Sequence, residues 1–222
     1  MAYDRYSDIL HSGETMENVN AIHIVELSDT GSRFKWIYNF VIACLCFVFV
    51  IPHLIVFALH PKKRLIRSDI STVKNLILSL IFLRHYRNLF YYRIGNIKYL
   101  FKWILPEDRS IHVPLSMRMG RSAQFVHNIS SFLNAERIGD NFVCYHHVTL
   151  GENRIGSNRK PIIGNNVTIY TGAVIAGAVK IGDNVKIGAN TVIVKDVPSD
   201  STVVGSPARI INYRGKKVDI LL

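Results

Sequence analysis

The chain has 222 residues, of which 49% are apolar and 19% charged, so it is neither disordered nor of low complexity. This length suits one full domain with a short appendage and excludes two ordinary enzyme domains. Lys and Arg outnumber Asp and Glu by 27 to 16, which gives a formal net charge of +11. The three cysteines fit neither a disulfide framework nor a zinc site, so a reduced compartment is favoured and no metal is expected.

Residues 1–36 are expected to form an N-terminal tail, and residues 37–60 contain no Asp, Glu, Lys or Arg. About 20 apolar residues span the hydrocarbon core of a bilayer, so this run predicts a membrane helix. Because Pro52 should kink the helix, a re-entrant hairpin is the alternative to a full crossing, and a buried core helix is a third reading. The basic residues that follow predict that the C-terminal part faces the cytoplasm.

Residues 61–110 are expected to form two amphipathic helices, with a break near Gly95. From Pro61 to Arg121 the chain holds 13 Lys and Arg residues against three acidic ones. A basic block beside a membrane attracts anionic lipid headgroups, at about 1 kcal/mol per residue, so membrane lipids are expected partners. Nucleic acid is not an expected partner, because no DNA- or RNA-binding motif matches the sequence.

The second half of the chain carries a six-residue repeat. Isoleucine recurs at a strict spacing of six from Ile163 to Ile193, and a small or β-branched residue stands four positions after each. Glycine follows the first residue of several repeats, as in IGNN at 163 and IGDN at 181. An amphipathic helix would need a period of about 3.6 and an alternating strand a period of about two, so the repeat indicates neither.

This repeat predicts a parallel β-helix over residues 111–213. Each hexad supplies one short strand and one tight turn, with its first residue inward and Gly or Asn in the turn. Stacked coils then bury a continuous aliphatic column. The spacing from Leu150 to Ile163 exceeds two hexads by one residue, so the polar segment between them is expected to form a loop at one corner. Residues 214–222 are interpreted as a C-terminal tail.

Residues 111–213 resemble the hexapeptide-repeat acyltransferases, in the serine acetyltransferase-like branch. The resemblance rests on the segments MGRSAQFVHN, RIGDNFVCYHHVTLG, RKPIIGNNVTIYTGAV, VKIGDNVKIGANTVIVKDVP and STVVGSPARII. The helical segment RHYRNLFYYRIG is similar to a subgroup found with capsule and exopolysaccharide genes, which acetylates sugars. The resemblance implies a left-handed coil, a homotrimer, and acetyl-CoA bound as co-substrate in the groove between adjacent β-helices.

His127, in the segment FVHN, aligns with the catalytic histidine of this family. A neutral imidazole, with an unperturbed pKa of about 6.5, can take the proton of a hydroxyl as that hydroxyl attacks a thioester. Counting hexads from Phe125 puts His127 third in its repeat, pointing away from the aliphatic column. A surface histidine at a turn is the alternative from the residues alone, and the resemblance favours the catalytic role.

Three positions depart from the family pattern. His112 stands where serine acetyltransferases carry an Asp, Val126 stands where an Asp often precedes the histidine, and Lys160 replaces a second histidine. Because those groups position serine in the family, their loss argues against serine as the acceptor. His146 and His147 lie at the outward turn of their hexad and, with His112 and Lys160, are candidate acceptor-site residues. A place at the subunit interface and solvated side chains are the alternatives for both histidines.

The resemblance also implies where acetyl-CoA binds. Gly151, Thr171 and Ala189 fall where the family's backbone lies along the pantetheine arm, although each could equally be a turn residue. Lys195 and Arg209 match cationic positions near the CoA phosphates, and cations pair well with phosphate. Solvated charge at the end of the coil is the alternative for these two.

Together these features predict a mainly β protein with a membrane-attached catalytic coil. The predicted function is an O-acetyltransferase at the bacterial inner membrane, facing the cytoplasm. It would move acetyl to a sugar hydroxyl of a capsule, exopolysaccharide or O-antigen, or of a lipid-linked precursor, so a glycan is an expected partner. The alternatives are a serine O-acetyltransferase of cysteine biosynthesis and a non-enzymatic trimeric membrane scaffold.

Overall fold

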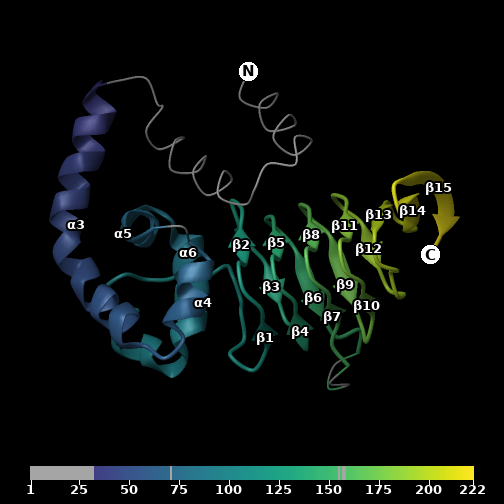
Figure 1. Cartoon of the computed structure of the whole chain (residues 1–222), viewed down its shortest axis with the longest axis horizontal. Helices are drawn as coiled ribbons and strands as arrows, with labels where there is room; N and C mark the ends of the chain where they lie inside the picture. The colour runs from purple at the N-terminus through teal and green to yellow at the C-terminus, as the bar shows by residue number, and fades with distance from the viewer. Residues whose placement is uncertain (1–32, 71, 155, 157–158) are drawn as a thin grey trace.

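The structure is a computed structural model that describes residues 33–70, 72–154, 156 and 159–222. Helices come first in the chain and short strands follow, with the strands stacked along one axis (Figure 1). The helical elements are α3 (Arg33–Leu59), α4 (Lys63–Ser68), α5 (Val73–Phe82), α6 (Arg84–Ile94) and the 3-10 helix η1 (Gly95–Leu100). The predicted N-terminal tail lies outside the described residues, apart from its last four, which begin α3.

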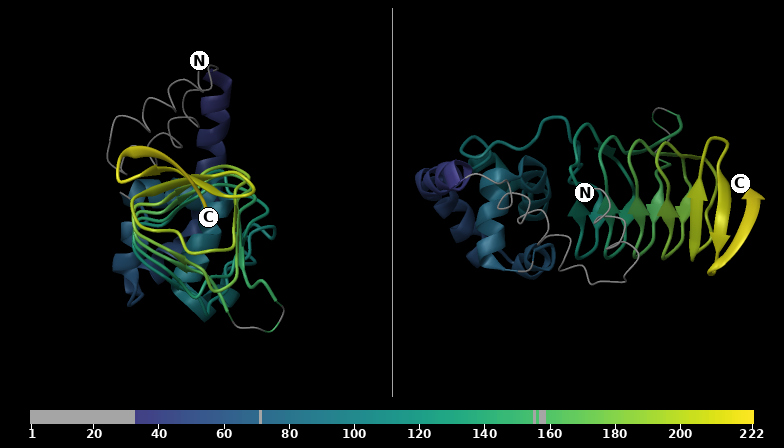
Figure 2. Two further views of the ribbon diagram at one scale, coloured as in Figure 1. Left: turned by 90° about the vertical axis from the view of Figure 1, so that its right-hand side faces the viewer. Right: turned by 90° about the horizontal axis from the view of Figure 1, so that it is seen from above.

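The strands form three sheets around a coil, which Figure 2 shows end-on and from above. The first sheet holds β1 (Arg118–Met119), β4 (Arg137–Ile138), β7 (Ile162–Ile163) and β10 (Lys180–Ile181). The second holds β2 (Gln124–Phe125), β5 (Val143–Cys144), β8 (Thr168–Ile169), β11 (Lys186–Ile187), β13 (Ser201–Val204), β14 (Arg209–Tyr213) and β15 (Lys216–Leu221). The third holds β3 (Phe132–Leu133), β6 (Thr149–Gly151), β9 (Val174–Ala176) and β12 (Val192–Ile193).

Successive strands enter successive sheets, so every third hexad returns to the same sheet one coil further on. Ile163 pairs in parallel with Ile181, Ile169 with Ile187, and Ile175 with Ile193. The predicted mainly β, parallel β-helix is therefore confirmed, and its handedness stays a prediction. The C-terminal segment adds an antiparallel hairpin, β14 and β15, beside β13.

The aliphatic column of the coil is made by the first residue of each hexad. These side chains are at most 3% exposed across the repeat, in Ile138, Cys144, Leu150, Ile163, Ile169, Ile175, Ile181, Ile187 and Ile193. Burial of one such isoleucine stabilises the fold by about 1.5–3 kcal/mol. Each coil can bury this column only against the coil before or after it, so the coils depend on one another.

One corner of the coil is held by a ladder of amide side chains. Asn141, Asn166, Asn184 and Asp200 occupy equivalent positions with φ between 55° and 60°, a backbone conformation that Asn and Asp tolerate better than branched residues. Asn141 Nδ2 donates to Asn166 Oδ1 at 2.7 Å, Asn166 to Asn184 at 2.9 Å, and Asn184 to Asp200 at 2.8 Å. The same residues thus make the turn and tie neighbouring coils together.

Residues 37–60, predicted to cross or re-enter a bilayer, form most of α3, and the structure gives the predicted membrane segment no support. Helix α3 instead packs on α5, with Val50 and His53 completely buried. His53 Nε2 lies 2.8 Å from the hydroxyl of Tyr91 on α6, which itself donates to Leu105 O. Within the described part of the chain, we find no helix with both the length and the apolar character that a bilayer crossing requires.

The basic block after α3 contributes to packing inside the protein. Its helices break first after Ser68, where α4 ends, and again at Leu83, between α5 and α6, and Gly95 ends α6 with φ 65°. Arg87 is buried and donates to the carbonyls of Leu80, Ile81 and Pro106. Part of the excess positive charge therefore forms hydrogen bonds that hold the helices to the following chain. The charge count alone did not indicate this structural role.

A buried ion pair fastens the helices to the first coil. Arg93 on α6 makes two bonds to Asp69, from Nε at 2.7 Å and Nη2 at 2.9 Å, and both side chains are at most 2% exposed. Arg93 also donates to the carbonyls of Met119 and Gly120, and Asp69 Oδ1 accepts the N–H of Ala123. Burial raises the pKa of Asp69 to about 6, although Arg93 and the Ala123 N–H favour its charged form.

We predict that Asp69→Asn destabilises the whole chain. The substitution would leave the Arg93 guanidinium buried without its counter-charge, which costs about 3–5 kcal/mol. The free energy of unfolding in urea at pH 7.5 measures this loss. Asp140→Asn is the control because Asp140 pairs with Arg121 at the surface, with side chains 34% and 68% exposed, and should cost at most about 1 kcal/mol. Equal losses for the two variants would contradict the prediction.

Candidate active site

One corner of the coil brings several predicted site residues into line. At this corner, which we call the histidine corner, the chain passes from the second sheet to the third through residues 126–131, 145–148, 170–173 and 188–191. The N–H of His147 donates to Ile129 O, that of Gly172 to His146 O, and that of Asn190 to Thr171 O. His146, Thr171 and Ala189 therefore follow one another along the corner from coil to coil.

His127 stands in the longest turn of the histidine corner. Six residues link β2 to β3, whereas four link β5 to β6. Ser130, with φ 49°, takes the place that matches His147, with φ 57°, in the next coil. The prediction that His127 is third in a regular hexad is therefore wrong, because two extra residues lengthen this turn. Its side chain is exposed nonetheless.

Buried neighbours fix the backbone on both sides of His127. Val126 and Asn128 are at most 2% exposed, and His127 between them has a left-handed φ of 44°. Asn128 Nδ2 lies 3.4 Å from the Sγ of Cys144 on β5. Burial raises the pKa of the Cys144 thiol far above its usual value, so this cysteine stays protonated and serves as packing.

Three histidines gather at this corner. The rings of His146 and His147 lie 5.3 Å apart, centroid to centroid, at an angle of 74°. The pKa of His146 is lowered by burial and then by the positive charges that His147 and His127 can carry. These interactions mean that His127 lies within electrostatic reach of His146. The corner thus brings together three imidazoles, the side chains most often used in general acid–base catalysis.

His112 lies beside the same turn but at a different edge. It bridges in parallel to Phe132 of β3, and its ring stacks on the Phe132 ring with centroids 4.7 Å apart and an angle of 9°. The adjoining Ser110 Oγ accepts the N–H of Ser130 at 2.9 Å. The segment with His112 therefore supports the turn that carries His127.

The remaining predicted residues divide between two corners and the C-terminal hairpin. Thr171 and Ala189 lie at the histidine corner, whereas Gly151 ends β6 and Lys195 comes just after β12, at the opposite edge of the third sheet. Lys160 also belongs to that opposite edge, at the end of the loop between β6 and β7. A Cβ added at Gly151 would meet no atom within 4 Å, so space is open there. Arg209 forms an ion pair with Asp219 across β14 and β15.

The outer face of the third sheet is apolar and open in the single chain. Phe132 is 43% exposed and Val192 37%, and Val194 just beyond β12 is 62% exposed. This face separates the histidine corner from the corner with Gly151 and Lys195, so the two groups of predicted residues cannot share one groove within one chain. As for metals, the described part of the chain holds no group of three or more His, Cys, Asp or Glu side chains that could bind one.

We predict that His146 titrates below the ordinary histidine value of 6.5. Because folding lowers its pKa, protonation opposes folding, and its contribution to stability is lost as the pH falls below 6.5. The pH titration of the imidazole NMR signals measures this pKa. His147→Asn should raise the pKa only part of the way, since burial is the larger cause. An unchanged His146 pKa in that variant would exclude the electrostatic contribution of His147.

Comparisons with known proteins agree with this architecture. Residues 160–195 match the family described as bacterial transferase hexapeptide (six repeats). A serine acetyltransferase of Synechococcus elongatus is 41% identical over 106 residues, which cover 47% of this chain and 43% of that protein. Across three such curated relatives, the chain spans between 38% and 60% of their length, or about half.

Solved structures give the same result. A serine acetyltransferase of Brucella abortus in complex with coenzyme A has a TM-score of 0.57 and 26% identity, covering 72% of each chain. A soybean serine acetyltransferase complexed with serine has a TM-score of 0.56 and 27% identity, covering 66% of each chain.

These comparisons correct two predictions from the sequence. The predicted polysaccharide O-acetyltransferase is contradicted, because relatives and structural neighbours alike are serine acetyltransferases. The predicted inner-membrane location is contradicted by the same relatives. Neither the capsule subgroup nor a glycan or lipid partner finds support. The coil is thus similar to the bacterial transferase hexapeptide family over residues 160–195 and to serine acetyltransferases over a longer stretch.

Proposed function

We propose that this protein is an acetyl-CoA-dependent serine O-acetyltransferase with His127 as its general base. The observation that carries the proposal is the histidine corner, where an exposed imidazole stands on a fixed turn within a coil whose relatives are serine acetyltransferases. The soybean relative complexed with serine and the Brucella relative complexed with coenzyme A support the choice of substrates.

The reaction would proceed by direct transfer. His127 takes the proton of the serine hydroxyl as the oxygen attacks the acetyl carbonyl of the thioester. The carbonyl oxygen becomes an oxyanion that a backbone N–H near the turn would stabilise. The tetrahedral intermediate then collapses, the bond to sulfur breaks, and the CoA thiolate takes the proton from His127. The lowered pKa of His146 keeps that ring neutral at pH 7, so it adds no charge that would hinder proton transfer to His127.

The divided cofactor residues favour an oligomer. Thr171 and Ala189 lie at one edge of the third sheet, and Gly151 and Lys195 at the other. A groove between two copies could join the histidine corner of one chain to the opposite corner of its neighbour. We propose a homotrimer with three such grooves, in which Lys195 and, after release from Asp219, Arg209 bind CoA phosphates. The apolar outer face of the third sheet would then be covered by a neighbouring chain.

Three departures bear on serine itself. His112, Val126 and Lys160 replace groups that help to position serine in the family. His112 is stacked on Phe132 and lies outside the histidine corner. Serine would therefore be held by other contacts. Its affinity should be lower than in a site where an acidic residue pairs with its ammonium group.

We predict that His127→Asn lowers kcat by about 100- to 10,000-fold with little change in stability, because an amide cannot accept the hydroxyl proton. CoA release with L-serine, followed by thiol detection, measures the rate. His60→Asn, a histidine variant at the end of α3, is the control and should retain activity. A His127→Asn rate within threefold of the wild type would refute the role of His127. CoA release with glycerol but not with serine, or failure to rescue a cysteine auxotroph, would refute the acceptor.

We predict that two inactive variants restore each other when mixed. His127→Asn removes the base, and Gly151→Trp fills the open space proposed for the pantetheine arm. If each groove joins two chains, random trimers from an equal mixture should contain about a quarter intact grooves. Activity after joint unfolding and refolding measures this recovery. Activity no greater than the sum of the two separate variants would show that each site lies within one chain.

A further inference from the structure

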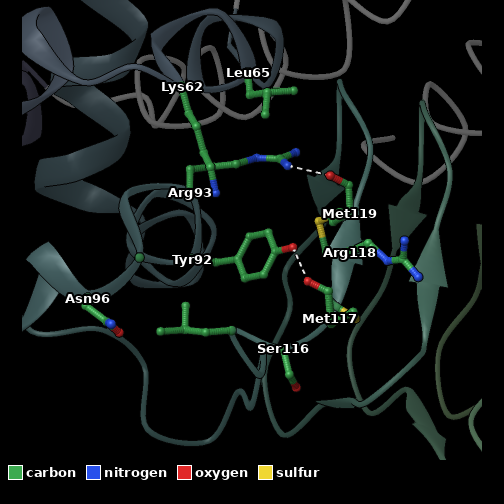
Figure 3. Close-up of a pocket in the computed structure, with 11 residues that line it drawn as sticks. Lys62, Leu65, Tyr92, Arg93, Asn96, Ser116, Met117, Arg118 and Met119 are labelled. Carbon is green, nitrogen blue, oxygen red and sulfur yellow. Dashed lines mark hydrogen bonds between the residues drawn. The ribbon is translucent and has the colours of Figure 1, made fainter.

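A cavity lies where the helices meet the first coil, apart from the histidine corner. Its volume is about 400 Å³, and its walls come from α4, α6, η1 and the segment that leads into β1 (Figure 3). We propose that this cavity binds a small organic oxyanion, a phosphate or carboxylate attached to an apolar group. Its lining includes the cations Lys62, Arg93 and Arg118 and the larger side chains of Tyr92, Leu115 and Met117.

Two of the cations that line the cavity, Lys62 and Arg118, have no acidic partner among the described residues, whereas Arg93 is paired with Asp69. No Asp or Glu side chain lines it, whereas Lys62 and Arg118 do. Neither of these two side chains forms a salt bridge with a described residue. Arg118 also pairs in register with Arg137 on the next strand, so a second cation stands nearby. An anion entering the cavity would relieve the repulsion among these cations.

Arg93 provides a fixed donor at the wall. It is 2% exposed, and its hydrogen bonds to Asp69, Met119 and Gly120 use four of its five N–H groups. The second N–H of Nη1 has no acceptor among the described residues. A buried donor that is already held in place loses little side-chain conformational entropy when it binds a ligand oxygen.

Most of the remaining lining is apolar, with Asn96 and Ser116 as its polar side chains. The Tyr92 hydroxyl donates to Met117 O at 2.7 Å, which fixes the ring against the coil, as the close-up shows (Figure 3). Leu65, Leu115 and Met119 supply further apolar surface. A ligand pocket of a few hundred Å³ with an apolar lining and a few convergent polar groups suits a small metabolite. Inorganic phosphate would satisfy the cations but leave this surface uncovered, so an organic anion should bind more tightly.

The site is separate from the proposed acetyl-transfer site. The cavity borders β1 in the first sheet, whereas His127 lies between the second and third sheets. A ligand here would touch both the helices and the first coil, so it would stabilise their attachment. Binding alone tests this proposal, so it can fail or succeed independently of serine acetylation.

Calorimetric titration of the full chain with phenyl phosphate and with benzoate tests the proposal. Saturating CoA is kept present so that the CoA phosphate positions are filled. At least one of the two anions should bind, more tightly than inorganic phosphate, and phenol should not. Binding should also raise the melting temperature, since the ligand binds the folded chain.

The double variant Lys62→Gln, Arg118→Gln should weaken binding by about tenfold or more, as expected when charge-assisted hydrogen bonds are lost. Lys180→Gln is the matched control, because Lys180 is an exposed cation on β10 of the same sheet and does not line the cavity. It should bind as the wild type does. Failure of both anions to bind at millimolar concentration, or equal affinity in the double variant, would overturn the proposal.

Discussion

The fold depends on a column of aliphatic side chains that no single coil can bury alone. Each hexad places one residue, such as Ile169 or Ile187, on the axis, where only the neighbouring coils exclude water from it. A coil of this kind has two open ends. The helices close one end through the Asp69–Arg93 pair, and the antiparallel hairpin of β14 and β15 lies at the other. The helices and the hairpin thus occupy the two ends of the repeat.

The same regularity explains where chemistry can occur. Packing in the column restricts the residue type at inward positions, and pairing in the sheets restricts it at strand positions. Residue type and turn length can therefore vary most at the corners. The histidine corner uses this freedom in one coil, where two extra residues lengthen the turn and expose His127. Buried Val126 and Asn128 keep the longer turn from moving freely. An irregular turn on a rigid scaffold is a common arrangement for a catalytic group.

The sequence predicted the coil because its period is strict from Ile163 to Ile193. It could not give the position of His127 correctly, because hexad counting assumes turns of equal length and the two extra residues have no distinctive composition. It also could not show what α3 packs against. The run is uncharged, yet His53 is buried against Tyr91, and only the folded chain shows that partner. The strand β15 was missed because KKVDIL has no hexad.

Local pattern also failed to separate surface charge from buried charge. Arg87 and Arg93 read as part of a basic block, but both are buried and bonded to the backbone or to Asp69. Asp69 comes 24 residues before Arg93, so no periodic rule joins them. Local pattern also could not show that the candidate acceptor residue His112 lies apart from His146 and His147. Its place beside Phe132 depends on how the chain enters the first coil.

The amide ladder along the corner at Asn141 gives the coil a direction. Each Nδ2 donates a hydrogen bond to the residue one coil nearer the C-terminal end. The series stops at Asp200, whose carboxylate can accept but cannot donate. A further coil stacked beyond Asp200 would find no donor there to continue the series. The row of side-chain dipoles thus finishes on an anion, so the hydrogen-bond series of this corner has a fixed C-terminal end.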